Sequence, residues 1–211
     1  MLAWAREIER HIPKSPGWWY GLSQLLLQWT FVPLFRVRLF GRANVPAEGG
    51  VLIVCNHQSF LDPMLIGMAL PRPVEFLARK SLFKNPFFGW LIRSVHALPI
   101  EREGRDVHAI KDAIRRLRDG HVMLLFPEGT RTRDGSIGPM RAGLSTIVVR
   151  SQCAVVPTVI QGAFEAWPRT QRLFRMRPIK VAFGKPIAPS DDMAGLSDEI
   201  KRRMDELVRF L

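Results

Sequence analysis

The sequence predicts an α/β fold with a mostly parallel central sheet flanked by helices, preceded by an N-terminal membrane-associating helical segment. Apolar runs such as Val51–Cys55 and Val122–Phe126 have the length and composition of buried strands. Segments with helical periodicity lie between such runs, and 106–119 is the clearest of them. Strands that alternate with helices are typical of parallel sheets, because a parallel pair needs a crossover connection. The long uncharged stretch 15–35 comes before all of these elements.

Length and charge limit what the chain can be. Its 211 residues suffice for one domain with a sizeable core, and we divide them into N-terminal helices, 1–40, and a main domain, 41–211. Lys and Arg number 31 against 19 Asp and Glu, a net charge of +12. This excess predicts anionic partners. We expect a membrane surface or phosphorylated molecules and no nucleic acid, because no nucleic-acid recognition motif is present.

The N-terminal 40 residues are rich in tryptophan, and basic residues flank the uncharged stretch 15–35 on both sides. Tryptophan favours the boundary between membrane and water, and basic side chains meet anionic head groups. Pro16, Gly17 and Pro33 interrupt the uncharged stretch, so we expect helices that lie in one leaflet and do not span the bilayer. The alternative is an ordinary helical hairpin that covers the core. No secretory signal is visible in 1–14, and we expect a peripheral protein on the cytoplasmic face of the inner membrane.

The main domain begins with a turn-rich link, 41–50, that leads into the Val51–Cys55 strand. A helix follows that begins near Asp62, which resembles an N-cap with Pro63 at the first helical position. Pro157 predicts a sheet edge or a bulge for its strand. The remaining expected elements are strands 74–78, 95–100, 122–126, 154–160 and 179–183, and helices 106–119, 144–150 and 197–211.

A histidine and a carboxylate lie where the first strand passes into the first helix of this domain. Ligands bind at such strand ends in α/β sheets. A neutral imidazole can accept a proton from a hydroxyl if a carboxylate holds its other nitrogen. Residues five apart do not share a helix face, so His57 and Asp62 can meet only if the chain turns between them. Alone, the pair could equally be a loop histidine and a helix cap.

A second motif, Phe126–Arg133, follows the fourth predicted strand and could open onto the same side of the sheet. Gly129 lets the backbone turn sharply, and Arg131 can bind a phosphate through two hydrogen bonds. Glu128 could accept a hydrogen bond from a substrate hydroxyl or hold Arg131 in place. A surface loop with solvated charges is the alternative.

The two motifs together resemble the glycerolipid acyltransferase family. The resemblance rests on Asn56–Asp62, followed about 65 residues later by Phe126–Arg131, and covers 39–185. An intervening block with Lys80 and Arg102 and a late strand, Val155–Ile160, are similar to further family motifs. Glu101 replaces the usual Asp, and Met140–Gly143 departs from a common Phe-Lys-x-Gly pattern.

The resemblance implies acyl transfer from an acyl thioester, on coenzyme A or acyl carrier protein, to the sn-2 hydroxyl of 1-acylglycerol 3-phosphate. His57 would be the general base and Asp62 would orient it. The second motif and the intervening block would bind the substrate, its phosphate above all. The residues expected to do so are Arg131, Glu128, Gly129, Thr130, Arg102 and Lys80.

Other chemistry finds less support in the sequence. We expect no metal and no cofactor, because His-Glu-x-x-His and Cys/His clusters are absent. Cys55 and Cys153 lie in or beside apolar runs and are expected to be reduced core thiols. Another acceptor, such as glycerol 3-phosphate or a different lysophospholipid, remains open, as does a membrane lipid-binding protein without catalysis.

Overall fold

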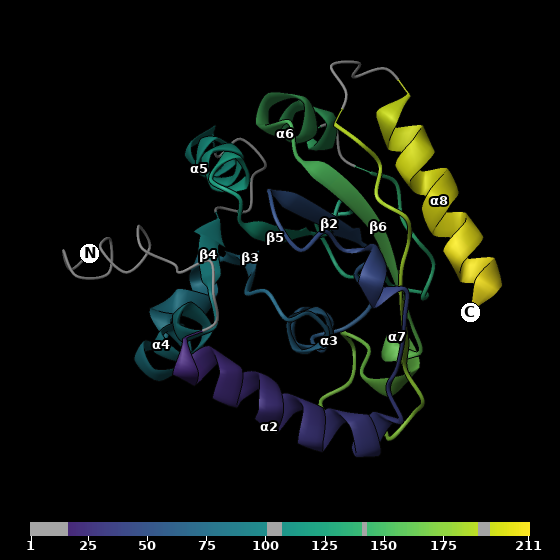
Figure 1. Ribbon diagram of the computed structural model, residues 1–211. Helices are drawn as coiled ribbons and strands as arrows, with labels where there is room; N and C mark the ends of the chain where they lie inside the picture. The colour runs from purple at the N-terminus through teal and green to yellow at the C-terminus, as the bar shows by residue number, and fades with distance from the viewer. Residues whose placement is uncertain (1–16, 101–106, 141–142, 190–194) are drawn as a thin grey trace.

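A seven-stranded sheet between two layers of helices forms the centre of the computed structural model (Figure 1). The structure describes residues 17–100, 107–140, 143–189 and 195–211. The strands lie in the order β1-β7-β6-β2-β5-β3-β4, and within the described residues β6–β7 is the one antiparallel pair. The predicted α/β class with a mostly parallel sheet is therefore confirmed. The strands are β1 Arg38–Phe40, β2 Val51–Cys55, β3 Val74–Arg79, β4 Ala97–Ile100, β5 Val122–Leu125, β6 Ala154–Gln161 and β7 Lys180–Phe183.

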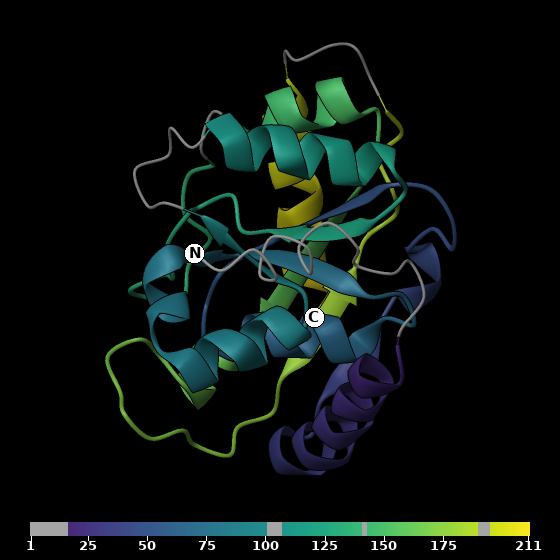
Figure 2. The same ribbon diagram turned by 90° about the vertical axis from the view of Figure 1, so that its left-hand side faces the viewer.

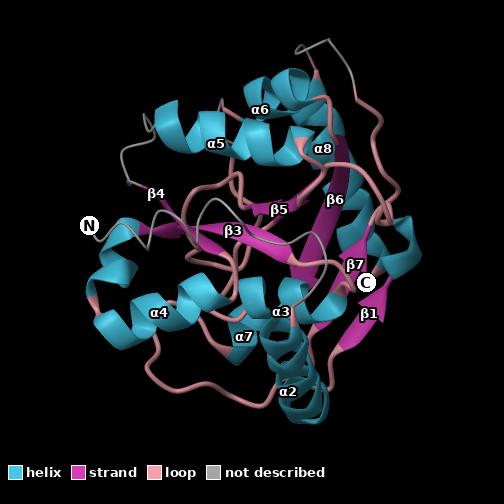
Figure 3. Cartoon of the chain, turned by 60° about the vertical axis from the view of Figure 1, so that its left-hand side comes forward, coloured by secondary structure: helices cyan, strands magenta, loops and turns pink. Residues whose placement is uncertain are grey.

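The helices divide between the two faces of the sheet, with α5, α6 and α8 on one face and α2, α3 and α7 on the other (Figures 1 and 3). The α-helices are α2 Trp18–Phe35, α3 Asp62–Ala69, α4 Pro86–Ser94, α5 Val107–Arg118, α6 Leu144–Ser151, α7 Ala163–Ala166 and α8 Leu196–Phe210, and the 3₁₀ helices are η1 Arg42–Asn44 and η2 Lys80–Lys84.

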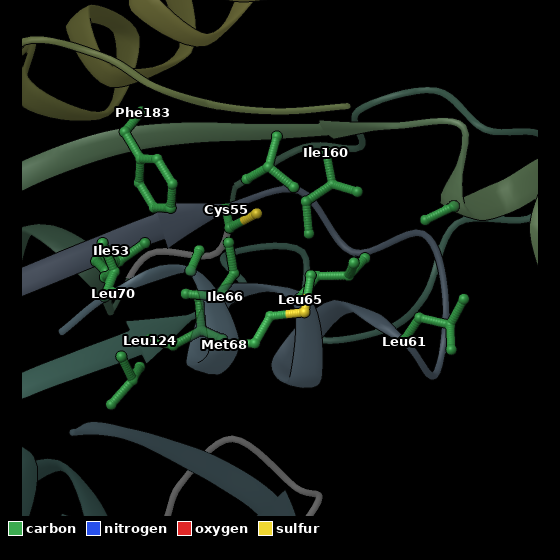
Figure 4. Packing of buried hydrophobic residues seen from close by; sticks show 14 of the residues in the cluster. Ile53, Cys55, Leu61, Leu65, Ile66, Met68, Leu70, Leu124, Ile160 and Phe183 are labelled. Carbon is green, nitrogen blue, oxygen red and sulfur yellow. The ribbon is translucent and has the colours of Figure 1, made fainter. Parts of the chain in front are cut away.

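Two apolar cores lie on the two faces of the sheet because side chains alternate along each strand. In β2, Ile53 and Cys55 pack on the α3 side, whereas Leu52 and Val54 pack on the α5 side. All five residues of β2 are buried, as expected of a central parallel strand covered on both faces. Figure 4 shows the α3 side, where Leu65 and Ile66 pack towards the strands. The strand end that carries His57 therefore has a rigid base.

Helix α2 turns two glutamines towards the end of α3 and carries a stripe of exposed apolar side chains on its outer face, while other apolar side chains, among them Tyr20 and Phe35, pack into the protein. Gln24 Nε2 donates to the carbonyls of Gly67 and Leu70, and Gln28 Nε2 donates to that of Met68. The outward stripe is apolar and consists of Trp18, Leu22, Leu25, Leu26, Trp29 and Val32, with Trp18 81% exposed. A surface helix of a water-soluble domain normally presents polar and charged side chains on its outer face. No helix in the described part of the chain combines the length and hydropathy that crossing a bilayer requires.

Two strands differ from the expectation for them. Residues 38–40, which we grouped with the N-terminal helices, form β1 and pair with β7. Pro157 predicted a sheet edge or a bulge for β6, and the edge is wrong, because β6 lies between β2 and β7. The Pro157 carbonyl accepts from Gly184 N at 2.8 Å, and the paired register with β7 starts one residue later, at Thr158. Proline has no N–H to donate in return, so Pro157 and Gly184 share one hydrogen bond and the paired register begins at the next residue.

His96 lies at the start of β4 in a buried polar cluster. Its ring stacks on Tyr20 of α2, with centroids 4.8 Å apart, and its φ of 68° is left-handed. The pKa of His96 is lowered from 6.5 to about 4, mainly by burial; the charge of Glu75 opposes this shift, and the charges of His121 and Arg116 add to it. Between pH 6.5 and 4 the unfolded chain therefore binds a proton that the folded chain excludes.

We therefore expect stability to fall as the pH drops from 7 to 5. The melting temperature of the wild type should decrease over this interval by several degrees more than that of His96→Asn, because asparagine tolerates a left-handed φ and does not titrate. Thermal unfolding followed by circular dichroism at both pH values measures the difference. Parallel pH profiles for the two proteins would contradict the assignment.

Candidate active site

Three neighbouring parallel strands, β2, β5 and β3, end at the same edge of the sheet. His57 follows β2, the Glu128–Arg131 segment follows β5, and Arg79 ends β3. The two motifs are thus adjacent in space although about 70 residues separate them. Asn56 fixes the first motif to β6, because its side chain donates to Ile160 O at 2.9 Å and accepts from Ile160 N at 2.8 Å.

His57 and Asp62 are in contact. His57 Nδ1 lies 2.8 Å from Asp62 Oδ2, and the same oxygen accepts from the amides of Gln58 at 2.6 Å and Ser59 at 2.8 Å. Asp62 is the first residue of α3, and Leu61, not Asp62, is the N-cap. The carboxylate therefore folds back over the 57–62 turn, where it closes the turn and binds the imidazole. This contact leaves Nε2 of His57 to face a substrate.

The Asp62 carboxylate is buried, with none of its surface exposed. Burial raises its pKa, and the hydrogen bond and charge of His57 and the two backbone amides oppose that rise. Phe126 stacks on the His57 ring with centroids 3.9 Å apart and planes 15° apart. One face of the imidazole is thus covered, and its side chain is 19% exposed. A carboxylate, a fixed tautomer and a shielded ring are what a general base needs.

The second motif holds the backbone of His57 on both sides. Glu128 Oε1 accepts from His57 N at 2.9 Å, and Thr132 N donates to His57 O at 2.8 Å. This contact gives Glu128 a role that the sequence did not predict. Burial raises the pKa of Glu128, and amide hydrogen bonds from His57 and Gly138 oppose the rise. Gly129 has φ 66°, so the turn requires a left-handed residue there, as the sequence suggested.

Arg131 is packed against an aromatic ring of the first motif. Its Cζ lies 3.4 Å from the centroid of Phe60, a cation–π contact. Its Nη1 is buried and makes no hydrogen bond within the described residues. Burial lowers the pKa of Arg131, the charges of Arg79 and Arg169 lower it further, and Asp62 opposes them. An orphaned guanidinium nitrogen beside two further arginines fits an anion such as a phosphate.

The other predicted substrate-binding residues are exposed or lie outside the described part of the chain. Lys80 begins η2, directly after Arg79, and is exposed. Thr130 is exposed beside Arg131. Arg102 lies outside the described residues. Within those residues, no group of three or more His, Cys, Asp or Glu side chains could hold a metal ion.

Arg79 and Arg169 were missed because nothing in their local sequence marks them. Arg79 ends a strand and Arg169 lies in a loop, where Arg169 Nη1 approaches Arg131 O at 3.4 Å. Gln58 was also missed, although its side chain joins the loop after β5 to helix α7. Its Nε2 donates to Gly135 O at 3.0 Å, and its Oε1 accepts from Phe164 N at 3.3 Å. Its position inside the first motif was the one available signal.

Known proteins share this architecture. The family model described as Acyltransferase matches residues 36–161, more than half of the chain. A relative from Bacillus subtilis (strain 168), named 1-acyl-sn-glycerol-3-phosphate acyltransferase, is 29% identical over 83% of this chain and 89% of its own length. The chloroplastic LPAT1 of Arabidopsis thaliana, also a 1-acyl-sn-glycerol-3-phosphate acyltransferase, is 27% identical, and the match covers 79% of this chain and 48% of that relative.

A solved structure is similar as well. The crystal structure of the 1-acyl-sn-glycerophosphate (LPA) acyltransferase PlsC from Thermotoga maritima superposes with a TM-score of 0.80 at 25% sequence identity. The match covers 90% of this chain and 79% of that one. Sequence and fold therefore agree on the same group of proteins.

Proposed function

The chain belongs to the acyltransferase family, and from this membership and the geometry of its site we propose that it acylates 1-acylglycerol 3-phosphate. An acyl thioester, on coenzyme A or acyl carrier protein, donates the fatty acyl chain, and the free sn-2 hydroxyl receives it to give phosphatidate. The observation that carries the proposal is the 2.8 Å contact between His57 Nδ1 and Asp62 Oδ2, beside an arginine with an unpaired buried nitrogen.

The reaction proceeds by direct attack of the acceptor. His57 Nε2 takes the proton of the sn-2 hydroxyl as its oxygen bonds to the thioester carbonyl carbon. Asp62 stabilises the imidazolium that results. The tetrahedral adduct then collapses, the C–S bond breaks, and His57 returns the proton to the departing thiolate. Atoms and charge balance without a covalent acyl-enzyme.

The acceptor's phosphate binds at the arginine cluster. Arg131 makes the closest contact through Nη1, and Arg79, Arg169 and Lys80 add positive charge around it. A dianionic phosphate offsets the mutual repulsion of these side chains, which is strong at a partly buried site. The cation–π contact with Phe60 holds the guanidinium plane in position before the acceptor arrives.

The outward apolar stripe of α2 supports a location on the membrane surface. Burial of Trp18 and Trp29 in the interfacial region removes apolar surface from water. The chain then lies as a peripheral protein on the cytoplasmic face of the inner membrane, where both lysophospholipid and thioester are available. Helix α2 lies in the leaflet and does not cross it.

The test crosses two donors, acyl-CoA and acyl carrier protein loaded with the same chain, with several acceptors. Thiol release should be greatest with 1-acylglycerol 3-phosphate. Greater turnover of glycerol 3-phosphate or of a lysophospholipid with a larger head group would reassign the acceptor. No turnover with any combination would favour a lipid-binding protein without catalysis.

Substitution of Arg131 should separate phosphate binding from chemistry. Arg131→Ala removes a charged hydrogen bond, so we expect kcat/KM for 1-acylglycerol 3-phosphate to fall about tenfold to a hundredfold, mostly through KM. Turnover of monoacylglycerol, which lacks the phosphate, should change much less. Arg133→Ala, two residues further along and exposed, is the matched control. An equal loss with both acceptors would argue against a phosphate contact.

A further inference from the structure

The loop between α7 and β7 is basic and projects from the molecule. Residues 168–179, which we call the arginine loop, contain four arginines and no acidic residue. Every residue from 172 to 178 is exposed. Two of the apolar side chains are among the most exposed of the described residues, Leu173 at 81% and Met176 at 71%. Loops normally present polar side chains to water, so this composition needs an explanation.

The arginine loop is held to the rest of the protein at several points along its length. Arg175 N donates to Ala166 O at 2.7 Å, and Trp167 Nε1 donates to Gln171 O at 3.1 Å. Gly162, with φ 89°, lets Pro178 approach, since a Cβ there would lie 2.1 Å from Pro178 O. These contacts give the exposed apolar tip a defined position.

The arginine loop adjoins both α2 and the candidate active site. Phe174 contacts Phe35 of α2 with ring centroids 5.7 Å apart, and contacts Trp167 at 6.1 Å. Trp167 in turn contacts Phe60, at 5.4 Å, and Arg131 covers Phe60. Figure 2 shows the loop, in yellow-green, at the same lower end of the molecule as α2, in purple. A series of rings thus connects α2, through the loop, to the phosphate-binding arginine.

We propose that the arginine loop is a second membrane-binding element, which inserts Leu173 and Met176 among the lipids of an anionic bilayer. Arg172, Arg175 and Arg177 alternate with the apolar residues and meet the anionic head groups. The proposal rests on the membrane association proposed for α2 and extends it to a lipid contact next to the site. A bilayer fits better than a protein groove, because large apolar side chains and arginines, in an exposed loop whose sequence contains no acidic residue, match the layered chemistry of a lipid surface.

In this position the arginine loop also provides a route by which the acceptor passes from the bilayer to the candidate active site. A lysophospholipid in the leaflet has its acyl chain among the lipids and its phosphate at the surface. The loop places the bilayer next to Phe60 and Arg131, so the acceptor's phosphate can reach Arg131 while its acyl chain stays along the rings of Phe174 and Trp167.

The experiment places a fluorescent label on the tip of the loop. The native thiols of Cys55 and Cys153 are buried, at 0% and 2% exposure, so a maleimide dye will react selectively with an introduced cysteine. Met176→Cys carries the label, and Val208→Cys, exposed on α8 of the opposite sheet face, is the control. Vesicles of phosphatidylglycerol with phosphatidylcholine should shift the Met176→Cys emission to the blue and leave that of Val208→Cys unchanged. An unshifted label at position 176 on vesicle-bound protein would overturn the proposal.

A second measurement compares the vesicle affinity of variants in which charges are introduced into the arginine loop or removed from it. The double variant Leu173→Asp/Met176→Asp should bind these vesicles at least tenfold more weakly than the wild type. Val208→Asp should bind within about twofold of it. The triple variant Arg172→Gln/Arg175→Gln/Arg177→Gln should lose affinity for anionic vesicles alone, about fivefold per charge removed. Binding by the double variant as tight as that of Val208→Asp would overturn the proposal.

Activity is measured separately so that the two proposals can fail independently. With a short-chain acceptor below its critical micelle concentration, the double variant should match the wild type, because no membrane is involved. If the wild type shows no turnover with any acceptor, the proposed function fails, while the vesicle experiment still decides the role of the loop. A double variant that is inactive on the short-chain acceptor but normal on vesicles would overturn the membrane role.

Discussion

His57→Ala should lower kcat/KM for acyl transfer by about a thousandfold, within the hundredfold to ten-thousandfold range that general base catalysis contributes. The substitution removes the imidazole that takes the proton from the acceptor hydroxyl. It keeps the backbone bonds of residue 57 to Glu128 and Thr132, so the loops around the site should stay in place. Thiol release from acyl-CoA with 1-acylglycerol 3-phosphate measures the loss.

The control for this prediction is His108→Ala, which removes an exposed histidine on α5. It should leave the rate within about twofold of the wild type, and both variants should melt close to the wild type. Vesicle binding should be unchanged in His57→Ala. If His57→Ala kept more than about a tenth of the wild-type rate, His57 would not be the base.

Asp62→Asn should lower kcat by about a hundredfold or more with a modest loss of stability. All three hydrogen bonds to this side chain reach one oxygen, Oδ2. An asparagine oxygen in the same place can accept all three, so the turn is kept while the negative charge is lost. The imidazolium that forms during the reaction then lacks its stabilising partner. The new amide nitrogen takes the place of Oδ1, which is buried without a hydrogen bond in the described structure, at a cost on the order of 1–3 kcal/mol.

Asp62→Ala completes the comparison. It removes the three hydrogen bonds as well as the charge, so it should lose more stability than Asp62→Asn while its kcat falls by at least as much. Chemical unfolding and initial rates measured on the same preparations separate the two effects. An Asp62→Asn variant with wild-type kcat and lowered stability would make Asp62 a structural residue alone.

The fold could be predicted from apolar runs because the central strands are buried on both faces. Val51–Cys55 was predicted at the bounds that the structure has, since every residue in it is apolar. β1 was missed, because the three residues of Arg38–Phe40 are too few to show a period. Helix α2 was predicted as uncharged and helical, but the direction of Gln24 and Gln28 depends on carbonyls at the end of α3, which no local pattern reveals.

The candidate site was predictable where its residues are close in sequence. The meeting of His57 and Asp62 followed from one turn between a strand and a helix. The Arg131 motif was expected on the same side of the sheet because it also follows a strand, but the pairing of β5 with β2 is known only from the structure. The contributions of Arg79 and Arg169 come from separate elements that only the tertiary fold brings to Arg131. Their roles, like those of Lys80, Thr130 and Arg102, are predictions for experiment.

The inward glutamines of α2 have a practical consequence for anyone who wants a trimmed enzyme. Gln24 and Gln28 bind three carbonyls in the closing turn of α3 or just beyond it, the helix that begins with Asp62. Deleting the first 35 residues to gain solubility would leave those carbonyls without their side-chain donors and destabilise α3, the helix that positions the Asp62 carboxylate. An active, lipid-free preparation should therefore be obtained by solubilising the full chain in detergent and not by truncating it.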